Sequence, residues 1–242
     1  MPSSDKLFSQ PIRDISDFTF DDNVASVFPD MITRSIPGYP LMIDNIGAIA
    51  ARYAKPKTTI YDLGCATGIA TLSIAKQIDP NCQVIGLDSS VAMVNQCKAY
   101  LNNYQHAAPI NIELADITAY HYQPASMFVM NFTLQFLAPD QRQQMLETIY
   151  NALLPGGVLI LSEKIRAEDP KSDDLLIDLH HQFKKHNGYS ELEISQKRTA
   201  LENVMLTDTL STHFTRLRTA GFKRITPWFS CFNFMSLVAH KE

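Results

Sequence analysis

A short loop after the first predicted strand has the composition of a nucleotide-binding turn. Residues 62–68 read "DLGCATG", in which Gly64 and Gly68 bracket a tight turn that leads into an apolar helix. Glycine adopts positive φ and lets a ligand approach the backbone closely, so this turn can hold a nucleoside-like molecule. The loop alone is a weak indication, because ordinary strand-to-helix turns also use glycine.

A carboxylate at the end of the next predicted strand strengthens the indication. Asp88 stands where a side chain can accept hydrogen bonds from both hydroxyl groups of a ribose. Its alternative role is to cap the helix that begins near Ser90, and the two roles are compatible. Ala66 replaces the second glycine that a pyrophosphate-binding turn prefers. The loop therefore favours S-adenosylmethionine over a nicotinamide dinucleotide.

Two more polar residues follow predicted strands. Asp116 comes after the third strand, where it can recognise the amino group of an adenine. Asn131 ends the fourth strand, where such a sheet opens toward the reacting centre. Each is weak evidence by itself, because Asp and Asn commonly form turns at strand ends.

Strands and helices alternate from residue 59 onward, which predicts the fold that positions these residues. The expected strands are 59–63, 83–88, 110–114, 126–133 and 158–164, and the expected helices between them are 69–78, 90–104 and 140–154. Helical crossovers imply an α/β, doubly wound, mostly parallel sheet that is covered on both faces. Residues 1–242 are expected to form a single domain, with N-terminal helices at about 1–55, a helical insertion at about 170–220 and a terminal hairpin whose two strands flank Ser230.

Composition narrows the range of partners. The net charge of -4 gives no broad basic surface, so we expect no direct nucleic-acid partner. No apolar run reaches membrane-spanning length and the first residues do not resemble a secretion signal, so we expect a cytoplasmic protein without a membrane partner. His180, His181 and His186 lack the spacing of a helical metal site, and no metal is expected.

Several longer segments resemble those of a known family. They are "VFPDMITRSIPGY", "YDLGC", "NFTLQFL", "LLPGG" and the unusual "NGYSELEISQKRTALENVMLTD", which is the most specific of them. Together they resemble, over essentially the whole chain, the carboxy-S-adenosyl-L-methionine synthase family. That resemblance implies the class I S-adenosylmethionine-dependent methyltransferase fold.

The resemblance also implies the residues of the site. It places ten residues around S-adenosyl-L-methionine or its carboxylated product, namely Tyr39, Gly64, Cys65, Ala66, Asp88, Ser89, Asp116, Ile117, Asn131 and Arg198. Arg198 would bind the carboxylate of the product, and Tyr39 would add a phenolic donor; these two are the expected catalytic residues. From spacing alone, Arg198 can instead be a solvated charge paired with Glu202 on one helix.

The implied reaction carboxylates the methyl group of S-adenosylmethionine, with prephenate as the carboxyl source and phenylpyruvate as the second product. A separate tRNA carboxymethyltransferase would then use the product to modify the wobble uridine of tRNA. The alternative function is an ordinary small-molecule methyltransferase. Apolar positions in the helical insertion lead us to expect a homodimer, in which Arg198 acts within its own subunit or across to the other.

Overall fold

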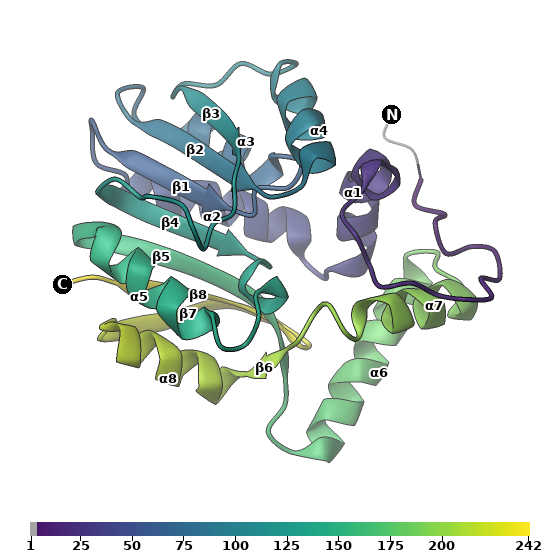
Figure 1. Ribbon diagram of the computed structural model, residues 1–242. Coiled ribbons are helices and arrows are strands. Elements are labelled where there is room, and N and C mark those ends of the chain that lie inside the picture. Colours follow the sequence, from purple (N-terminus) through teal and green to yellow (C-terminus); the bar gives the residue numbers. More distant parts are fainter. Residues whose placement is uncertain (1–3) are drawn as a thin grey trace.

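A mostly parallel sheet forms the centre of the molecule (Figure 1). The computed structural model describes residues 4–242, and within them eight strands form one sheet in the order β3-β2-β1-β4-β5-β8-β7, with β6 paired to β5. The first five strands run parallel, whereas β8 is antiparallel to both β5 and β7. The strands are β1 Thr59–Leu63, β2 Gln83–Asp88, β3 Ile110–Leu114, β4 Ala125–Asn131, β5 Leu153–Arg166, β6 Asp208–Thr209, β7 Arg224–Cys231 and β8 Phe234–His240.

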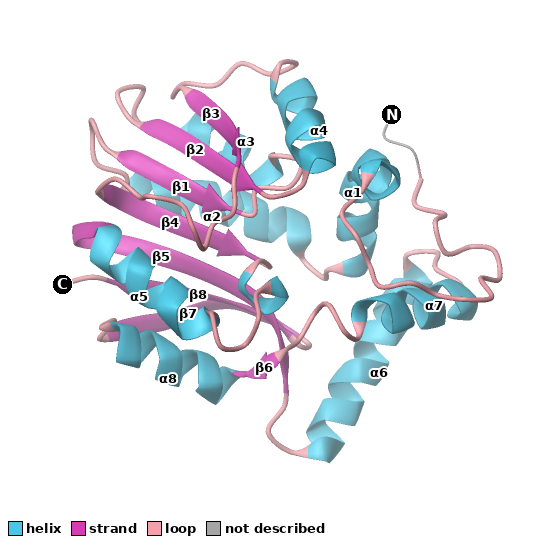
Figure 2. Cartoon of the chain, in the orientation of Figure 1, coloured by secondary structure: helices cyan, strands magenta, loops and turns pink. Residues whose placement is uncertain are grey.

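Helices cover both faces of this sheet (Figure 2). Strand β1, "TIYDL", is fully buried, and its side chains alternate between the faces. Ile60 packs on one face with α2 (Tyr39–Tyr53) and α3 (Ile69–Gln77). Tyr61 and Leu63 pack on the other face with α5 (Arg142–Ala152) and α8 (Leu210–Ala220). The predicted doubly wound fold is confirmed.

The strand order reverses between β1 and β4, which are direct neighbours. From β1 the chain proceeds through α3, β2, α4 (Val91–Leu101) and β3 toward one edge, and then returns to β4 beside β1. Crossovers on either side of this point leave a crevice beyond the carboxyl ends of the strands, where ligands bind in folds of this kind. The loops after β1, β2, β3 and β4 therefore meet at one place.

The N-terminal segment and two inserted helices lie beyond the carboxyl ends of the strands (Figure 1). They comprise residues 4–21, α1 (Asp22–Ser35), α6 (Pro170–His186) and α7 (Glu191–Leu201). Gln196 of α7 joins them, because its Oε1 accepts from the Ile12 amide at 2.6 Å and its Nε2 donates to the Phe8 and Gln10 carbonyls at 2.9 Å each. The insertion and the N-terminal segment thus form one continuous wall.

Three expected boundaries differ from those observed. Helix begins only at Asp22 in the described N-terminal segment, and the part of the expected 1–55 region that falls on residues 1–3 lies outside the described residues. Helix α8 does not belong to the insertion, because Leu217 and Ala220 pack in the core cluster of the sheet. The terminal hairpin is present at the sheet edge, but its turn is at Phe232 and Asn233. Among residues 4–242, no helix combines the length and apolar character needed to cross a membrane.

We expect Gln196→Ala to loosen the N-terminal segment. The substitution removes three hydrogen bonds and leaves three backbone groups to be satisfied by water, so the free energy of unfolding should fall by about 1–3 kcal/mol. Hydrogen exchange at the amides of residues 8–12 should accelerate more than exchange in the sheet. Gln182→Ala, at an exposed position on α6, is the control. Unchanged exchange at residues 8–12 would show that other contacts hold this segment.

Candidate active site

Functional side chains stand at or just beyond the carboxyl ends of five neighbouring strands. In sheet order from β3 to β5 they are Asp116, Asp88, the loop at 64–66, Asn131 and Lys164. All ten residues expected at the ligand line one cavity of about 600 Å³: Tyr39, Gly64, Cys65, Ala66, Asp88, Ser89, Asp116, Ile117, Asn131 and Arg198. Small-molecule sites have volumes of roughly 300–1,000 Å³. The grouping of these residues is observed, and their ligand roles stay predictions.

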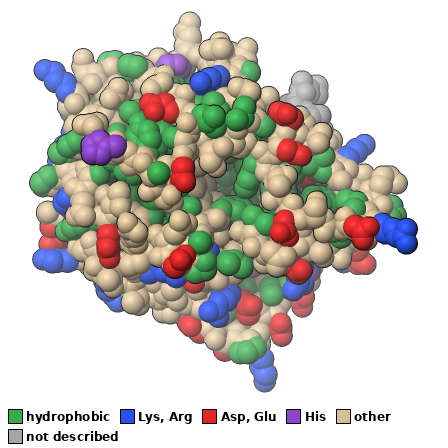
Figure 3. All heavy atoms as spheres, viewed as in Figure 1, with side chains coloured by type: hydrophobic (Ala, Val, Ile, Leu, Met, Phe, Trp, Pro, Cys, Tyr) green, Lys and Arg blue, Asp and Glu red, His purple; other side chains and the backbone are tan. Residues whose placement is uncertain are grey.

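The surface is hollowed near the middle of the face shown in Figure 3, with hydrophobic side chains around much of the hollow. Apolar residues from α1, from the residues that flank it and from the loop after β4 contribute to the cavity lining, among them Phe20, Met31, Ile36, Phe132 and Phe136. Mainly apolar walls with a few polar groups are typical of sites that bind an organic molecule.

Packing against Thr133 explains the first glycine of the loop. Gly64 has φ of 73°, and a Cβ there would lie only 2.5 Å from Thr133 Oγ1. The same Thr133 hydroxyl donates to the Leu63 carbonyl at 2.7 Å, so it cannot move away without losing that bond. The backbone of the loop therefore lies so close to Thr133, which follows β4, that only a residue without a side chain fits at position 64.

Asp88 holds the loop in its conformation. Its Oδ2 accepts from the Ala66 amide at 2.9 Å, and its Oδ1 accepts from the Ser90 amide at 2.9 Å. Ala66 has a positive φ of 47°, which is uncommon for a residue with a side chain and marks local strain. Burial raises the pKa of Asp88, and the amide hydrogen bonds oppose that shift. Each carboxylate oxygen retains a lone pair with which to accept from a ribose hydroxyl.

The alternative role of Asp88 as the helix cap is wrong. Ser90 is the N-cap of α4, and its Oγ accepts from the Met93 amide at 3.1 Å. The carboxylate of Asp88 accepts a hydrogen bond from the amide of Ser90, the capping residue, and not from an amide within the helix. Asp116, by contrast, is a turn former at an exposed position, since its Oδ1 accepts from the Thr118 amide and hydroxyl.

Two buried polar atoms of the cavity lining have no hydrogen-bond partner in the described protein: Thr67 Oγ1 and Asn131 Oδ1. Buried polar groups are nearly always satisfied, so such atoms indicate a missing bonding partner such as a ligand or an ordered water. Thr67 lies within the glycine loop after β1 and Asn131 ends β4, on the two sides of the switch point. With the free lone pairs of Asp88, these atoms fit a polar adenosyl ligand.

Tyr39 and Asp62 are both buried residues of the cavity lining. Tyr39 is 6% exposed, and burial, with a smaller effect from Asp62, raises its pKa well above the usual range. Its phenol therefore stays protonated and can donate a hydrogen bond. Asp62 is 1% exposed and accepts from Thr71 Oγ1 at 2.6 Å, and burial raises its pKa to about 6. Asp62 is not among the residues expected at the site from the sequence, because it lies within the expected strand 59–63.

Cations gather where the inserted helices meet the cavity. Arg198 of α7 lines it together with Lys164 of β5 and Lys184 of α6. Arg198 does not form the alternative pair with Glu202 that its spacing allows: in residues 4–242 it has no ion pair within 4.0 Å. Neither lysine was expected at the site from the sequence, although Lys164 follows the buried run of β5 at the carboxyl end of a central strand. Within the same residues, no group of three His, Cys, Asp or Glu side chains is arranged to hold a metal ion.

The fold and the cavity define a protein of the S-adenosylmethionine-dependent methyltransferase class. A family model described as a methyltransferase domain matches residues 60–157. An O-methyltransferase family protein from Burkholderia thailandensis superposes with a TM-score of 0.65 at 14% identity, over 91% of this chain and 60% of its own. Human N-acetylserotonin methyltransferase gives 0.60 at 15% identity, over 91% and 55%. At these identities the two structures show the fold alone.

Closer relatives identify the family. The carboxy-S-adenosyl-L-methionine synthase of Aliivibrio fischeri is 57% identical over 242 residues, which cover 100% of both chains. The protein of that name from Pseudomonas putida is 53% identical over 240 residues, or 97% of each chain. This chain therefore belongs to the carboxy-S-adenosyl-L-methionine synthase family and is an enzyme of that kind, as the resemblance of its motifs indicated.

We expect Asp88→Ala to weaken binding of S-adenosylmethionine by about 30-fold or more. The variant loses an acceptor for ribose hydroxyls and the support of the strained loop, which together correspond to about 2 kcal/mol or more. Isothermal titration calorimetry measures the change, with Asp44→Ala, at an exposed position on α2, as the control. An unchanged dissociation constant would exclude Asp88 from the adenosyl site.

We expect Asp62→Asn to reduce the pH dependence of stability. The pKa of Asp62 is raised from 3.8 to about 6, so the folded protein binds this proton more tightly than the unfolded chain does. The resulting stabilisation is full below about pH 4 and is lost as the pH rises through about 6. The amide cannot ionise, so the variant does not lose this stabilisation. Between about pH 4 and about pH 7, its free energy of unfolding should therefore rise by about 2 kcal/mol relative to that of the parent. Urea unfolding at a series of pH values measures this, and parallel curves would contradict it.

Proposed function

We propose that this protein converts S-adenosyl-L-methionine and prephenate to carboxy-S-adenosyl-L-methionine and phenylpyruvate. The observation that carries the proposal is the cationic end of the cavity, formed by Arg198, Lys164 and Lys184. Cations beside a sulfonium repel it unless anions lie between them, so a site for methyl transfer to a neutral acceptor gains nothing from them. Carboxylate substrates and a carboxylated product supply those anions. The names of the close relatives support carboxy-S-adenosyl-L-methionine as the product.

The atoms of this reaction balance without an added reagent. Prephenate becomes phenylpyruvate when it loses carbon dioxide and hydroxide, and its ring becomes aromatic. Hydroxide takes one proton from the sulfonium methyl group to form water, and carbon dioxide forms a bond to that carbon. No side chain of the protein is needed as a base, and Tyr39, whose pKa is raised by burial, acts as a hydrogen-bond donor.

Arg198 has a defined role in this scheme. A guanidinium presents a planar pair of N–H groups that matches a carboxylate, so Arg198 can bind the carboxyl group before and after its transfer. The adenosyl part of the ligand contacts the strand-end residues in both states. Arg198 therefore distinguishes the carboxylated product from unmodified S-adenosylmethionine, whereas Asp88 does not.

The proposal extends to the partners of the enzyme. Its product would serve a separate tRNA carboxymethyltransferase that modifies the wobble uridine, in the cytoplasm. The net charge of -4 suits an enzyme that supplies this step without holding tRNA. We also propose a homodimer, because Leu175 of α6 and Leu192 of α7 are 58% and 39% exposed and a second subunit would cover them.

Mass analysis of the products tests the reaction. The protein incubated with S-adenosylmethionine and prephenate should yield carboxy-S-adenosyl-L-methionine and phenylpyruvate in equal amounts. An ordinary methyltransferase would instead yield S-adenosylhomocysteine in the presence of an acceptor. Absence of both products would indicate a protein that binds the ligand without turnover.

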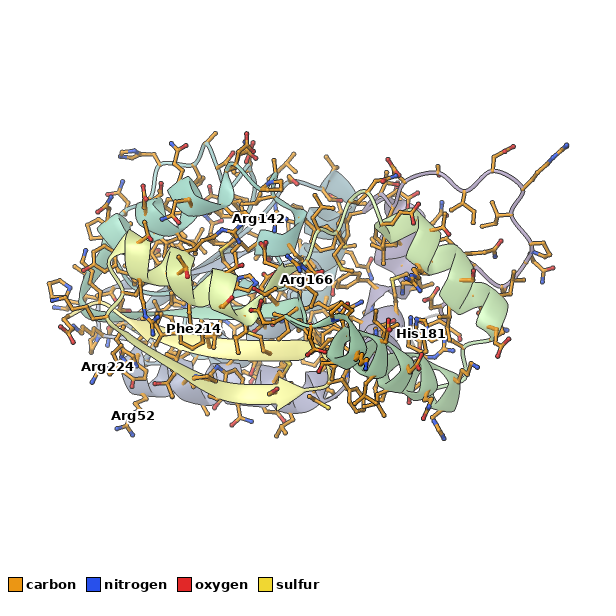
Figure 4. The ribbon with its side chains drawn as sticks, turned by 90° about the horizontal axis from the view of Figure 1, so that it is seen from below. Arg52, Arg142, Arg166, His181, Phe214 and Arg224 are labelled. Atoms are coloured by element: carbon orange, nitrogen blue, oxygen red, sulfur yellow. The ribbon has the colours of Figure 1, made fainter. Side chains whose placement is uncertain are left out.

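In the same assay, Arg198→Ala should lose most of the carboxylated product. Its affinity for S-adenosylmethionine should remain within about twofold of the parent. Its binding free energy for carboxy-S-adenosyl-L-methionine should weaken by about 2–5 kcal/mol, because the charge-assisted pair between Arg198 and the carboxylate is lost. Arg224→Ala is the control, because Arg224 is exposed and lies on β7 at the opposite end of the molecule from α6 (Figure 4). Equal weakening of both ligands would place Arg198 in the shared adenosyl site.

A further inference from the structure

The insertion side of the cavity contains more positive charge than one carboxylate requires. Lys164, Lys184 and Arg198 come from three different elements, β5, α6 and α7, and all three line the cavity. None of them has an ion pair within 4.0 Å in residues 4–242. Figure 4 shows α6, with His181 labelled, beyond the ends of the sheet strands.

Lys197 is a fourth cation of the cavity lining, but it has partners within the protein. Its Nζ lies 3.7 Å from Asp5 Oδ2 and 3.2 Å from Ser35 Oγ, and the side chain is 13% exposed. Tyr189 donates to the same Asp5 oxygen at 2.5 Å. Lys197 is thus paired within the protein, whereas its neighbours Lys164 and Lys184 are not.

The unpaired lysines destabilise each other. Burial lowers the pKa of Lys184 to about 7, with further lowering by Lys164, Lys197 and Arg198. Burial also lowers the pKa of Lys164, and Arg198 lowers it further, whereas Asp173 partly opposes the shift. Partly desolvated charges of one sign are unfavourable unless an anion joins them. This end of the cavity is therefore complementary to a ligand with negative charge.

An apolar wall adjoins the lysines. Phe132 and Phe234, both in the cavity lining, meet edge to face with their ring centres 5.8 Å apart. The His180 ring packs edge to face on Phe234 at 4.9 Å, and its Nε2 donates to the Ser35 carbonyl at 2.8 Å. Burial and the neighbouring lysines lower the pKa of His180 to about 3, so this imidazole remains neutral. A planar hydrocarbon ring can pack on this wall.

We propose that Lys164 and Lys184 form a second anion subsite, distinct from Arg198, that holds the carboxylate which the carboxyl donor keeps throughout the reaction. The donor class is an α-keto acid with a six-membered unsaturated ring, whose ring packs against Phe132 and Phe234. This assignment rests on the proposed function for the identity of the donor.

The sheet order places Lys164 beyond the strand ends that accompany the adenosyl ligand. Neighbouring strands are about 4.8 Å apart, so Lys164 on β5 lies about one strand beyond Asn131 on β4. The strand-end residues from β3 to β4 accompany the adenosyl ligand, and β5 is the next strand along the same edge. A donor with two carboxylates can thus direct one toward the sulfonium and Arg198 and place the other on the lysines.

Binding of phenylpyruvate tests the subsite, because this molecule carries the retained carboxylate and lacks the migrating one. Calorimetry with S-adenosylhomocysteine already bound should show binding to the parent protein. Lys164→Met and Lys184→Met, which keep an apolar stem, should each raise the dissociation constant of phenylpyruvate about tenfold or more. Lys185→Met is the control, since Lys185 is the next residue of α6 but is exposed and paired with Glu191. S-adenosylhomocysteine affinity should stay within about twofold in all variants, which shows that they fold.

The outcomes separate this inference from the reaction itself. If the parent makes no carboxylated product from prephenate but binds phenylpyruvate through the two lysines, the subsite stands and prephenate is the wrong donor. If the parent makes the product and either lysine variant binds phenylpyruvate as tightly as the parent, the subsite is overturned. Absence of phenylpyruvate binding to the parent would also overturn it, as would equal loss in the Lys185 control.

Discussion

The switch point between β1 and β4 is the constraint on which the rest of this site depends. Parallel strands point their carboxyl ends to the same edge, and the reversal of strand order keeps the crossovers from covering that edge. Loops that are distant in the sequence therefore meet at this edge, although each of them is short. Gly64 shows how closely they do so, because the space that its side chain would occupy is already filled by Thr133 from the neighbouring strand's loop.

A buried polar network fixes the loop that follows β4. Glu163 is fully buried, and its two carboxylate oxygens accept from the amides of Leu134 and Gln135 at 3.0 Å each. Arg142, 1% exposed, donates to the Gln135 carbonyl at 3.0 Å and pairs with Asp208. Burial raises the pKa of Glu163 to about 8, while the amides and Arg142 favour its ionised form. The cavity wall contributed by this loop is thus set by interactions outside the cavity.

The sequence predicted the parts of this structure that follow from local pattern. Hydrophobic periodicity located the strands, and the strand-end rule then placed Asp88 and Asn131 at one ligand site. The N-cap residue of α4 was harder to predict, because Asp and Ser are both favourable at that position. Only the backbone geometry at Ser90 distinguishes Ser90 from Asp88 as the cap. Helix α8 was grouped with the insertion because its periodicity cannot reveal which surface it packs on.

The cationic end of the cavity could not be read from spacing. Lys164 and Lys184 are separated by the turn before α6 and most of that helix, and neither has a partner along the chain that would mark it. Arg198 was identified only through the family resemblance, since a basic residue on a polar helix is usually a solvated one. Convergence of charges from β5, α6 and α7 is a property of tertiary structure.

The three hydrogen bonds of Gln196 have a consequence for the order in which the protein assembles. They join α7 to Phe8, Gln10 and Ile12, which lie 184 to 188 residues away along the chain. Closing a loop of that length is entropically unfavourable and slow compared with forming neighbouring contacts. The central strands and their crossover helices can form from nearby segments during synthesis, but this wall must wait until α7 has been made. The nascent chain consequently acquires a complete binding cavity only near the end of its translation.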